Sequence, residues 1–290
     1  MTGPARADGD QGRDVKAQPE LLELAQEVAL AAGELLRARL PEVAGGLLLA
    51  GGASAKSSPT DLVTDVDRSS EALIVGSLLR ARPDDGVHGE EGSSRKGSTG
   101  LTWVIDPLDG TINYLYGIPV FSVSIAAWVA GRSIVGVVHN PSTGEMFTAS
   151  ERTGAALDGR ELRLEATGRP IGEALVGTGF SYSARNRAAQ ARLLSVVLPE
   201  VRDIRRAGSA ALDLCAVACG RLDAFYESEL KPWDSAAGGL IAREAGATVI
   251  ALEGLFEGPT ILAAAPGLQA PLVELLRRAA AAPHPAPEAS

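Results

Sequence analysis

Two aspartates lie three residues apart in the segment Trp-Val-Ile-Asp-Pro-Leu-Asp-Gly-Thr, residues 103–111. The apolar residues before Asp106 predict a buried strand, and Pro107 predicts that its hydrogen-bond ladder stops there. Asp109 and Gly110 favour a turn, after which a helix can begin. Hard cations such as Mg²⁺ take oxygen ligands, and the N–H groups of a helix start favour phosphate. The segment therefore predicts a metal and phosphate site, with a simple turn at its Asp-Gly tip as the structural alternative.

Three further acidic segments could complete such a site, and each also has a purely structural explanation. Residues 89–92 place two glutamates in one Gly-bounded loop, where they repel each other unless they are solvated or bound to a cation. Residues 61–67 hold three aspartates, and Asp65 or Asp67 could cap the following helix. Asp234 begins a Gly/Ala-rich run and could likewise be an N-cap, a role that is compatible with metal binding.

Other catalytic chemistries find little support in the sequence. It contains no GxxxxGK[ST] phosphate loop, no HExxH and no GxSxG motif. The three histidines form no cluster, and Cys215 and Cys219 lie in an apolar stretch without the spacing of a metal site. We interpret both cysteines as small buried residues that fill the core.

Hydrophobic periodicity predicts the elements that must position these residues. Strands alternate with helices along the chain, which favours layered sheets and helices over a helical bundle or an all-β sandwich. We expect disordered tails over residues 1–18 and 283–290, and two halves over residues 19–155 and 156–282, the second carrying Asp234. The predicted helices cover residues 19–40, 67–80, 188–198, 209–220, 234–245 and 268–280, and the predicted strands cover residues 102–105, 120–129, 133–139, 146–149, 175–179, 248–251 and 261–264.

An excess of acidic residues limits the classes of partner. Asp and Glu total 36 against 27 Lys and Arg, a formal net charge of −9, which argues against broad binding to nucleic acid or anionic membranes. Divalent cations on clustered carboxylates would let such a protein hold an anionic substrate. The chain shows no signal peptide and no apolar run near the roughly 20 residues that span a bilayer. We therefore expect a soluble cytoplasmic protein.

Together these motifs resemble the inositol monophosphatase family, which belongs to a wider group of lithium-sensitive, magnesium-dependent phosphatases. Residues 106–111 match the first signature of the family and residues 233–246 match the second. Residues 56–59, 61–64 and 89–91 also fall where the family has them, in the same order. The resemblance covers most of the chain. It implies a mixed α+β and α/β fold, a layered α-β-α-β-α sandwich of the inositol monophosphatase and fructose-1,6-bisphosphatase type, and a homodimer.

The resemblance also implies a role for each matching residue. Two or three Mg²⁺ ions would be held by Glu90, Asp106, the Leu108 carbonyl, Asp109 and Asp234. Thr111 and Asp67 would orient the attacking water. The implied substrate contacts are the N–H groups of Gly110 and Thr111 for the phosphate, Gly208, Ser209 and Ala210 along the pocket, and Glu227 for an inositol hydroxyl. Lys56 would lie on a lid loop over residues 45–58 that is mobile without metal.

These implied roles describe the hydrolysis of inositol-1-phosphate, a small phosphorylated polyol, by water that Mg²⁺ activates. A histidinol-phosphate phosphatase built on the same core is the alternative, because the Glu227 carboxylate could bind either polyol hydroxyls or an ammonium group. A non-enzymatic regulatory protein associated with RNA is an alternative of another class. The acidic charge and the complete set of implied ligands argue against it. Ile112 departs from the family, where many members have a second threonine.

Overall fold

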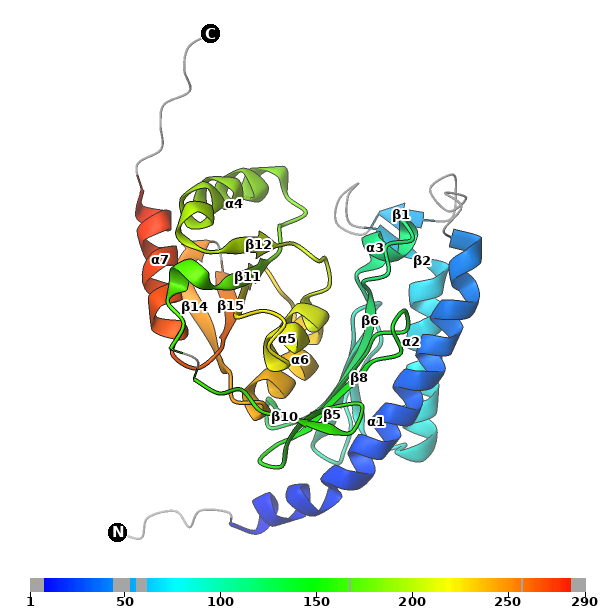
Figure 1. Cartoon of the computed structure of the whole chain (residues 1–290). Coiled ribbons are helices and arrows are strands. Elements are labelled where there is room, and N and C mark those ends of the chain that lie inside the picture. Colours follow the sequence, from blue (N-terminus) through cyan, green and yellow to red (C-terminus); the bar gives the residue numbers. More distant parts are fainter. Residues whose placement is uncertain (1–7, 44–52, 56–61, 167, 257, 283–290) are drawn as a thin grey trace, which may run out of the picture.

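The computed structural model describes residues 8–43, 53–55, 62–166, 168–256 and 258–282, and it forms five alternating layers of helices and sheets (Figure 1). These layers confirm the α-β-α-β-α architecture. The outer layers are helices α1 (Asp8–Val43) and α2 (Asp65–Ala81) on one side and α4 (Ala184–Val197) and α7 (Gln269–Ala281) on the other, and α5 (Ala210–Ala218) and α6 (Pro232–Glu244) form the central layer.

The first sheet has eight strands in the order β10-β9-β8-β7-β6-β5-β3-β4. Its neighbouring strands are antiparallel except β3 and β5, which are parallel. Helices cover both faces, which explains why β5 is buried almost throughout. The strands are β3 (Gly86–Gly89), β4 (Ser94–Arg95), β5 (Leu101–Asp109), β6 (Ser122–Val129), β7 (Arg132–His139), β8 (Met146–Ser150), β9 (Gly154–Leu157) and β10 (Arg160–Leu162).

The second sheet has five strands in the order β12-β11-β13-β15-β14. The first three are parallel, and β15 is antiparallel to both of its neighbours. The strands are β11 (Leu175–Thr178), β12 (Asp203–Arg205), β13 (Ala224–Ser228), β14 (Thr248–Phe256) and β15 (Gly258–Ala264). Among the described residues, the remaining elements are the strand pair β1 (Ala53–Ala55) and β2 (Leu62–Thr64), helix α3 (Thr111–Leu115) and two 3₁₀ turns, Ile171–Glu173 and Leu198–Glu200.

Apolar side chains fill three cores between the layers. In the first core the rings of Tyr114 and Phe121 meet edge to face with centroids 5.0 Å apart, and the Tyr114 hydroxyl donates to the Leu36 carbonyl at 2.7 Å. Cys215 is buried in the second core and Cys219 packs at its margin, both as free thiols. Because aromatic residues are few, most contacts between the layers are made by Leu, Val, Ile and Ala side chains.

Helix α1 is longer than predicted at both ends. It begins at Asp8 and passes Pro19, and it continues past Pro41 to Val43. A proline inside a helix removes one backbone hydrogen bond, yet the helix is continuous through Pro19. The helix includes residues from Asp8 onward, where the sequence analysis expected a disordered tail. Residues 1–7 and 283–290 lie outside the described residues.

Strand β5 also runs further than predicted. The sequence predicted an end at residue 105 because of Pro107, yet the strand continues to Asp109. Its pairing with β6 shifts register between Asp106 and Asp109, so that Pro107 falls at a bulge. A residue at a bulge need not donate to the ladder, which removes the objection to proline.

Several short strands were not predicted at all, among them β3, β12 and β13. The expected boundary between residues 155 and 156 falls inside β9, and the first sheet ends only with β10. Lys56 and most of the predicted lid loop lie outside the described residues. Among the described residues, none of the helices combines the length and apolar character needed to span a bilayer.

Helix α6 touches the first sheet backbone to backbone at Gly136, which gives a testable expectation. A Cβ on Gly136 would lie 2.9 Å from the Ala237 carbonyl oxygen and 3.1 Å from the Ala237 Cα. Because neither atom belongs to a flexible side chain, we expect Gly136→Ala to destabilise the protein by about 1–3 kcal/mol. Urea unfolding measures the change. Gly76→Ala in α2 is the control, since no atom lies within 4 Å of that Cβ, and it should stabilise by up to about 1 kcal/mol. Equal effects at both glycines would contradict the close packing.

Candidate active site

The carboxyl end of β5 places the central carboxylate of the candidate site. Asp106 is buried, and its Oδ1 accepts the Leu108 N–H at 3.0 Å. Gly110 then adopts a left-handed conformation with φ 93° and begins α3. The Thr111 hydroxyl lies 2.9 Å from Asp67 Oδ1 and 3.0 Å from the Leu108 carbonyl oxygen. The structure thus confirms the predicted strand, turn and helix, and it brings Asp67 to Thr111.

Helix α2 holds this segment through one buried face. Asp67 lies in the first turn of α2, and Ser70 follows it three residues later on the same side. Both side chains are buried, and the Ser70 hydroxyl donates to the Pro107 carbonyl at 3.0 Å. The bulge of β5 is therefore fixed directly by a helix side chain. Ser70 could not be predicted from the sequence, because its role depends on a contact between distant segments.

Asp109 joins the first half of the chain to the start of α5. Its Oδ2 accepts the Ser209 hydroxyl at 2.5 Å and the Ala211 N–H at 2.8 Å. Ser209 is also the N-cap of α5 and accepts the Leu212 N–H at 3.3 Å. Anions are stabilised at helix N-termini, so α5 supports the charge of Asp109. Ser209 is fully buried in these contacts, which makes it a support for Asp109.

Asp234 enters the site from the first turn of α6. Lys231 is the N-cap and Asp234 occupies the third helical position, where its Oδ2 accepts the Lys231 N–H at 2.6 Å. The preceding Trp233 ring lies 5.1 Å from the His88 ring, centroid to centroid, and the Ser124 hydroxyl donates to the Trp233 carbonyl at 3.3 Å. The start of α6 is therefore docked on the first sheet, beside the strand that leads to Glu90.

These carboxylates raise one another's pKa. Burial raises the pKa of Asp106 well above its ordinary value, and the negative charges of Glu90, Asp109 and Asp234 raise it further. Burial also raises the pKa of Asp234, and Asp109 adds to that shift. The pKa of Asp109 rises to about 6 through burial, although the hydrogen bonds from Ser209 and Ala211 oppose the shift. A bound cation would stabilise the ionised form of all these groups.

The carboxylates of Glu90, Asp106, Asp109 and Asp234 suit a hard divalent cation, because all of them offer oxygen as the ligand atom. Among the described residues, no group of three or more His, Cys, Asp or Glu side chains is arranged to hold a metal ion, so side chains alone supply no cage there. Mg²⁺ seldom needs such a cage, since it keeps several waters and binds through one or two carboxylates together with substrate phosphate. The open grouping therefore fits Mg²⁺ bound with a substrate better than a structural ion.

Glu227 lies on the side of the second sheet, on β13. Its carboxylate sits directly over Gly179, where a Cβ would come within 2.0 Å of it. Burial raises the pKa of Glu227 well above its ordinary value, Arg206 lowers it, and Asp213 raises it. A glycine beneath the carboxylate is thus a steric requirement for this arrangement.

The loop that leads to Ser209 is also closely held. The Asn113 amide donates to the Val120 carbonyl at 2.7 Å and to the Ala207 carbonyl at 2.8 Å. A Cβ on Gly208 would lie 2.8 Å from the Asn113 side chain and 2.6 Å from the Arg206 guanidinium. Gly208 therefore lies between these two side chains, and Ala210 follows it at the start of α5.

Asp213 is an acidic residue of this region that the sequence analysis missed. It is buried in α5, and burial together with the charge of Asp109 raises its pKa to about 8, whereas Arg206 lowers it. The available signal was a single acid within an otherwise apolar helix. A single acid in an apolar helix can equally lie at an exposed position, so this signal did not identify Asp213 as a residue of the site.

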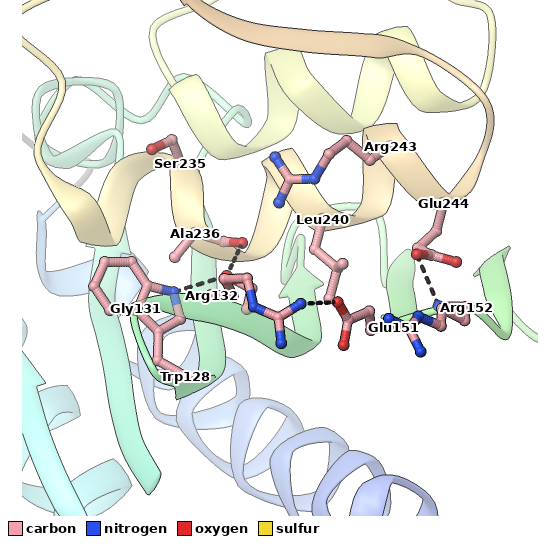
Figure 2. A pocket seen from close by; sticks show the side chains of 11 residues that line it. Trp128, Gly131, Arg132, Glu151, Arg152, Ser235, Ala236, Leu240, Arg243 and Glu244 are labelled. Carbon is pink, nitrogen blue, oxygen red and sulfur yellow. Dashed lines mark hydrogen bonds and ion pairs between the residues drawn. The ribbon is translucent and has the colours of Figure 1, made fainter. Parts of the chain in front are cut away.

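A separate pocket of about 540 Å³ lies along α6 (Figure 2). Its acidic groups are already engaged, since Glu151 accepts from Arg132 at 2.6 Å and Glu244 accepts the Arg152 N–H at 2.9 Å. Arg243 extends into the same region. None of the site residues predicted from the sequence is among the described residues that line this pocket. It is therefore distinct from the candidate active site.

The buried carboxyl of Asp213 should make stability depend on pH. Its pKa is about 8 in the folded protein against an ordinary 3.8, so the folded state binds more protons between these values. Stability is then lost as the pH rises from about 4 to about 8. We expect Asp213→Asn to recover at least about 1 kcal/mol of that loss, measured by urea unfolding in EDTA. Glu274→Gln removes an exposed charge and should keep the parent pH dependence. An unchanged pH dependence in Asp213→Asn would contradict the assignment.

Comparison with known proteins shows the family of this chain. The model of the inositol monophosphatase family matches residues 17–284. The chain is 45% identical over 278 residues to an inositol-1-monophosphatase from Mycobacterium leprae, covering 90% of this chain and 94% of that protein. It is 46% identical over 200 residues to the Nus factor SuhB of Xylella fastidiosa, covering 69% and 72%. The solved structure of Mycobacterium tuberculosis SuhB gives a TM-score of 0.76 at 40% identity, covering 90% and 97%. The chain therefore belongs to the inositol monophosphatase family.

Proposed function

We propose that this protein is a Mg²⁺-dependent phosphatase that hydrolyses inositol-1-phosphate to inositol and phosphate. The observation that carries the proposal is the convergence of Asp106, Asp109 and Asp234, which come from β5 and α6 and raise one another's pKa. The bonded pair of Thr111 and Asp67 lies beside them. Family membership supports a phosphatase, and the name of the relative from Mycobacterium leprae supports this substrate.

Mg²⁺, when bound, would lower the pKa of a water molecule and neutralise charge on the phosphoryl oxygens. The ions, two or three in number, would be held by Glu90, Asp106, the Leu108 carbonyl, Asp109 and Asp234. The homodimer and the inhibition by Li⁺, which the family resemblance implies, stay predictions, as does the cytoplasmic location expected from the lack of a signal peptide and of an apolar span.

Thr111 and Asp67 would handle the proton of the attacking water. The Thr111 hydroxyl donates to the buried Asp67 carboxylate at 2.9 Å, which leaves the Thr111 oxygen free to accept a hydrogen bond from water. Asp67 would accept the proton that Thr111 passes on. The N–H groups of Gly110 and Thr111, at the start of α3, would hold the phosphate while water attacks from the opposite side.

Glu227 distinguishes the two candidate substrates. Its carboxylate could accept hydrogen bonds from inositol hydroxyls or pair with the ammonium group of histidinol phosphate. Glu227→Gln keeps an acceptor but loses the charge. We expect kcat/KM for inositol-1-phosphate to exceed that for histidinol phosphate and to fall by about 10-fold or less in the variant. A preference for histidinol phosphate, with a loss of about 100-fold in the variant, would assign the rival substrate instead.

A regulatory role is the second candidate, because the relative from Xylella fastidiosa carries the name Nus factor. Such a role would be non-enzymatic and associated with RNA. The net charge of −9 and the complete set of acidic residues favour the phosphatase. Retention of the protein on RNA at physiological salt, together with no phosphate release from a panel of phosphomonoesters, would reverse this order.

Asp106 gives the most direct test of the phosphatase. We expect Asp106→Asn to lower kcat/KM by at least about 100-fold, because it removes the charge at the centre of the carboxylate group. Release of inorganic phosphate in Mg²⁺ measures the effect, and the unfolding temperature checks that the variant is folded. Asp203→Asn changes an exposed aspartate and should leave both values unchanged. Near-normal Mg²⁺-dependent release by Asp106→Asn would overturn the proposal.

A further inference from the structure

Glu71 is a buried carboxylate of α2 that none of the roles above uses. It lies four residues after Asp67 and therefore on the same face of the helix, with an exposed fraction of only 3%. Its Oε2 accepts the Glu91 N–H at 2.8 Å, and its Oε1 accepts the Ser93 N–H at 2.9 Å. Both oxygens of a buried charge are thus committed to the backbone of one short loop.

The same loop leaves space for this carboxylate at Gly89. A Cβ on Gly89 would lie 2.4 Å from Glu71 Oε2. The Gly89 N–H donates to the Ser93 carbonyl at 2.7 Å, and the Glu90 N–H donates to the Ile105 carbonyl of β5 at 3.1 Å. Glu90 is therefore held between the loop that Glu71 fixes and the strand that carries Asp106.

Hydrogen bonds to an ionised acceptor are about twice as strong as neutral ones, and buried polar groups require hydrogen-bond partners. Two backbone donors from one loop give Glu71 a fixed geometry. They also give the loop a single conformation. The contact between Glu90 and Asp106 depends on that conformation, because the position of the Glu90 backbone decides where its carboxylate points.

We propose that Glu71 is a positioning residue for metal binding, which holds the loop of residues 89–93 so that Glu90 faces Asp106. Asp67, Ser70 and Glu71 then form one face of α2 that contacts Thr111, the β5 bulge and the Glu90 loop. The inference rests on the proposed function, because it assigns Glu90 to the metal centre. A merely structural role would lower stability without changing the affinity for metal.

The test measures metal binding directly and without substrate. Mn²⁺ serves as the probe, and electron paramagnetic resonance measures the free ion in titrations of the full chain. We expect Glu71→Gln to weaken Mn²⁺ binding by about 10-fold or more, because the Gln side chain keeps an acceptor for only one of the two N–H groups. Amide hydrogen exchange at Glu91 and Ser93 should become faster. Glu274→Gln, which removes an exposed charge on α7, should change neither measurement.

A second variant approaches the same contact from the loop. Gly89→Ala places a methyl group where Glu71 Oε2 lies, so it should weaken Mn²⁺ binding in the same direction while Glu71 keeps its charge. It also covers the case in which Glu71→Gln does not fold. Unchanged Mn²⁺ affinity in a folded variant, with only a lower unfolding temperature, would overturn the inference.

The outcomes also separate this inference from the proposed function. If the unmodified protein binds Mn²⁺ and both variants weaken it, yet no phosphomonoester is hydrolysed, the positioning role is supported and the phosphatase is overturned. If the unmodified protein hydrolyses inositol-1-phosphate while Mn²⁺ affinity is the same in all variants, the phosphatase is supported and the positioning role is overturned. An unmodified protein that binds no Mn²⁺ overturns the role of Glu71.

Discussion

Several carboxylates must lie close together in a buried place, and the rest of the structure is organised around that constraint. Each charge disfavours the ionised form of its neighbours. Backbone N–H groups offset part of this repulsion, from Leu108 for Asp106, from Ala211 for Asp109 and from Lys231 for Asp234. These donors come from a strand bulge and from two helix starts. The two halves of the chain therefore contact each other through hydrogen-bonded carboxylates as well as through an apolar core.

The sequence predicted the parts of this arrangement that depend on local pattern. The apolar strand before Asp106, the turn at Gly110 and the helix behind it follow from residue types alone. The alternation of strands and helices was sufficient for the layers. The roles given to Asp106, Asp109 and Asp234 required the family resemblance, because each aspartate taken alone is also explained as a turn or helix-start residue.

What could not be predicted depends on contacts between distant segments. Ser70, Glu71 and Asp213 sit in stretches whose periodicity indicates only an amphipathic or apolar helix. Pro107 was misread because a bulge, which depends on the partner strand, removes the need for its N–H. In each case tertiary packing outweighed a local signal.

Glycines on both sides of α6 have a consequence for ion selectivity. Gly136 lets the first sheet touch the backbone of the helix, and a Cβ on Gly238 would lie 2.9 Å from Leu214 of α5. The helix that carries Asp234 is therefore packed closely against the first sheet on one side and against α5 on the other. Under the proposed function, this fixed helix position would favour cations of one bond length, and Mg²⁺ and Ca²⁺ differ in bond length by about 0.3–0.5 Å. The side chain of Asp234, and not the backbone of α6, would then have to adjust to a larger ion.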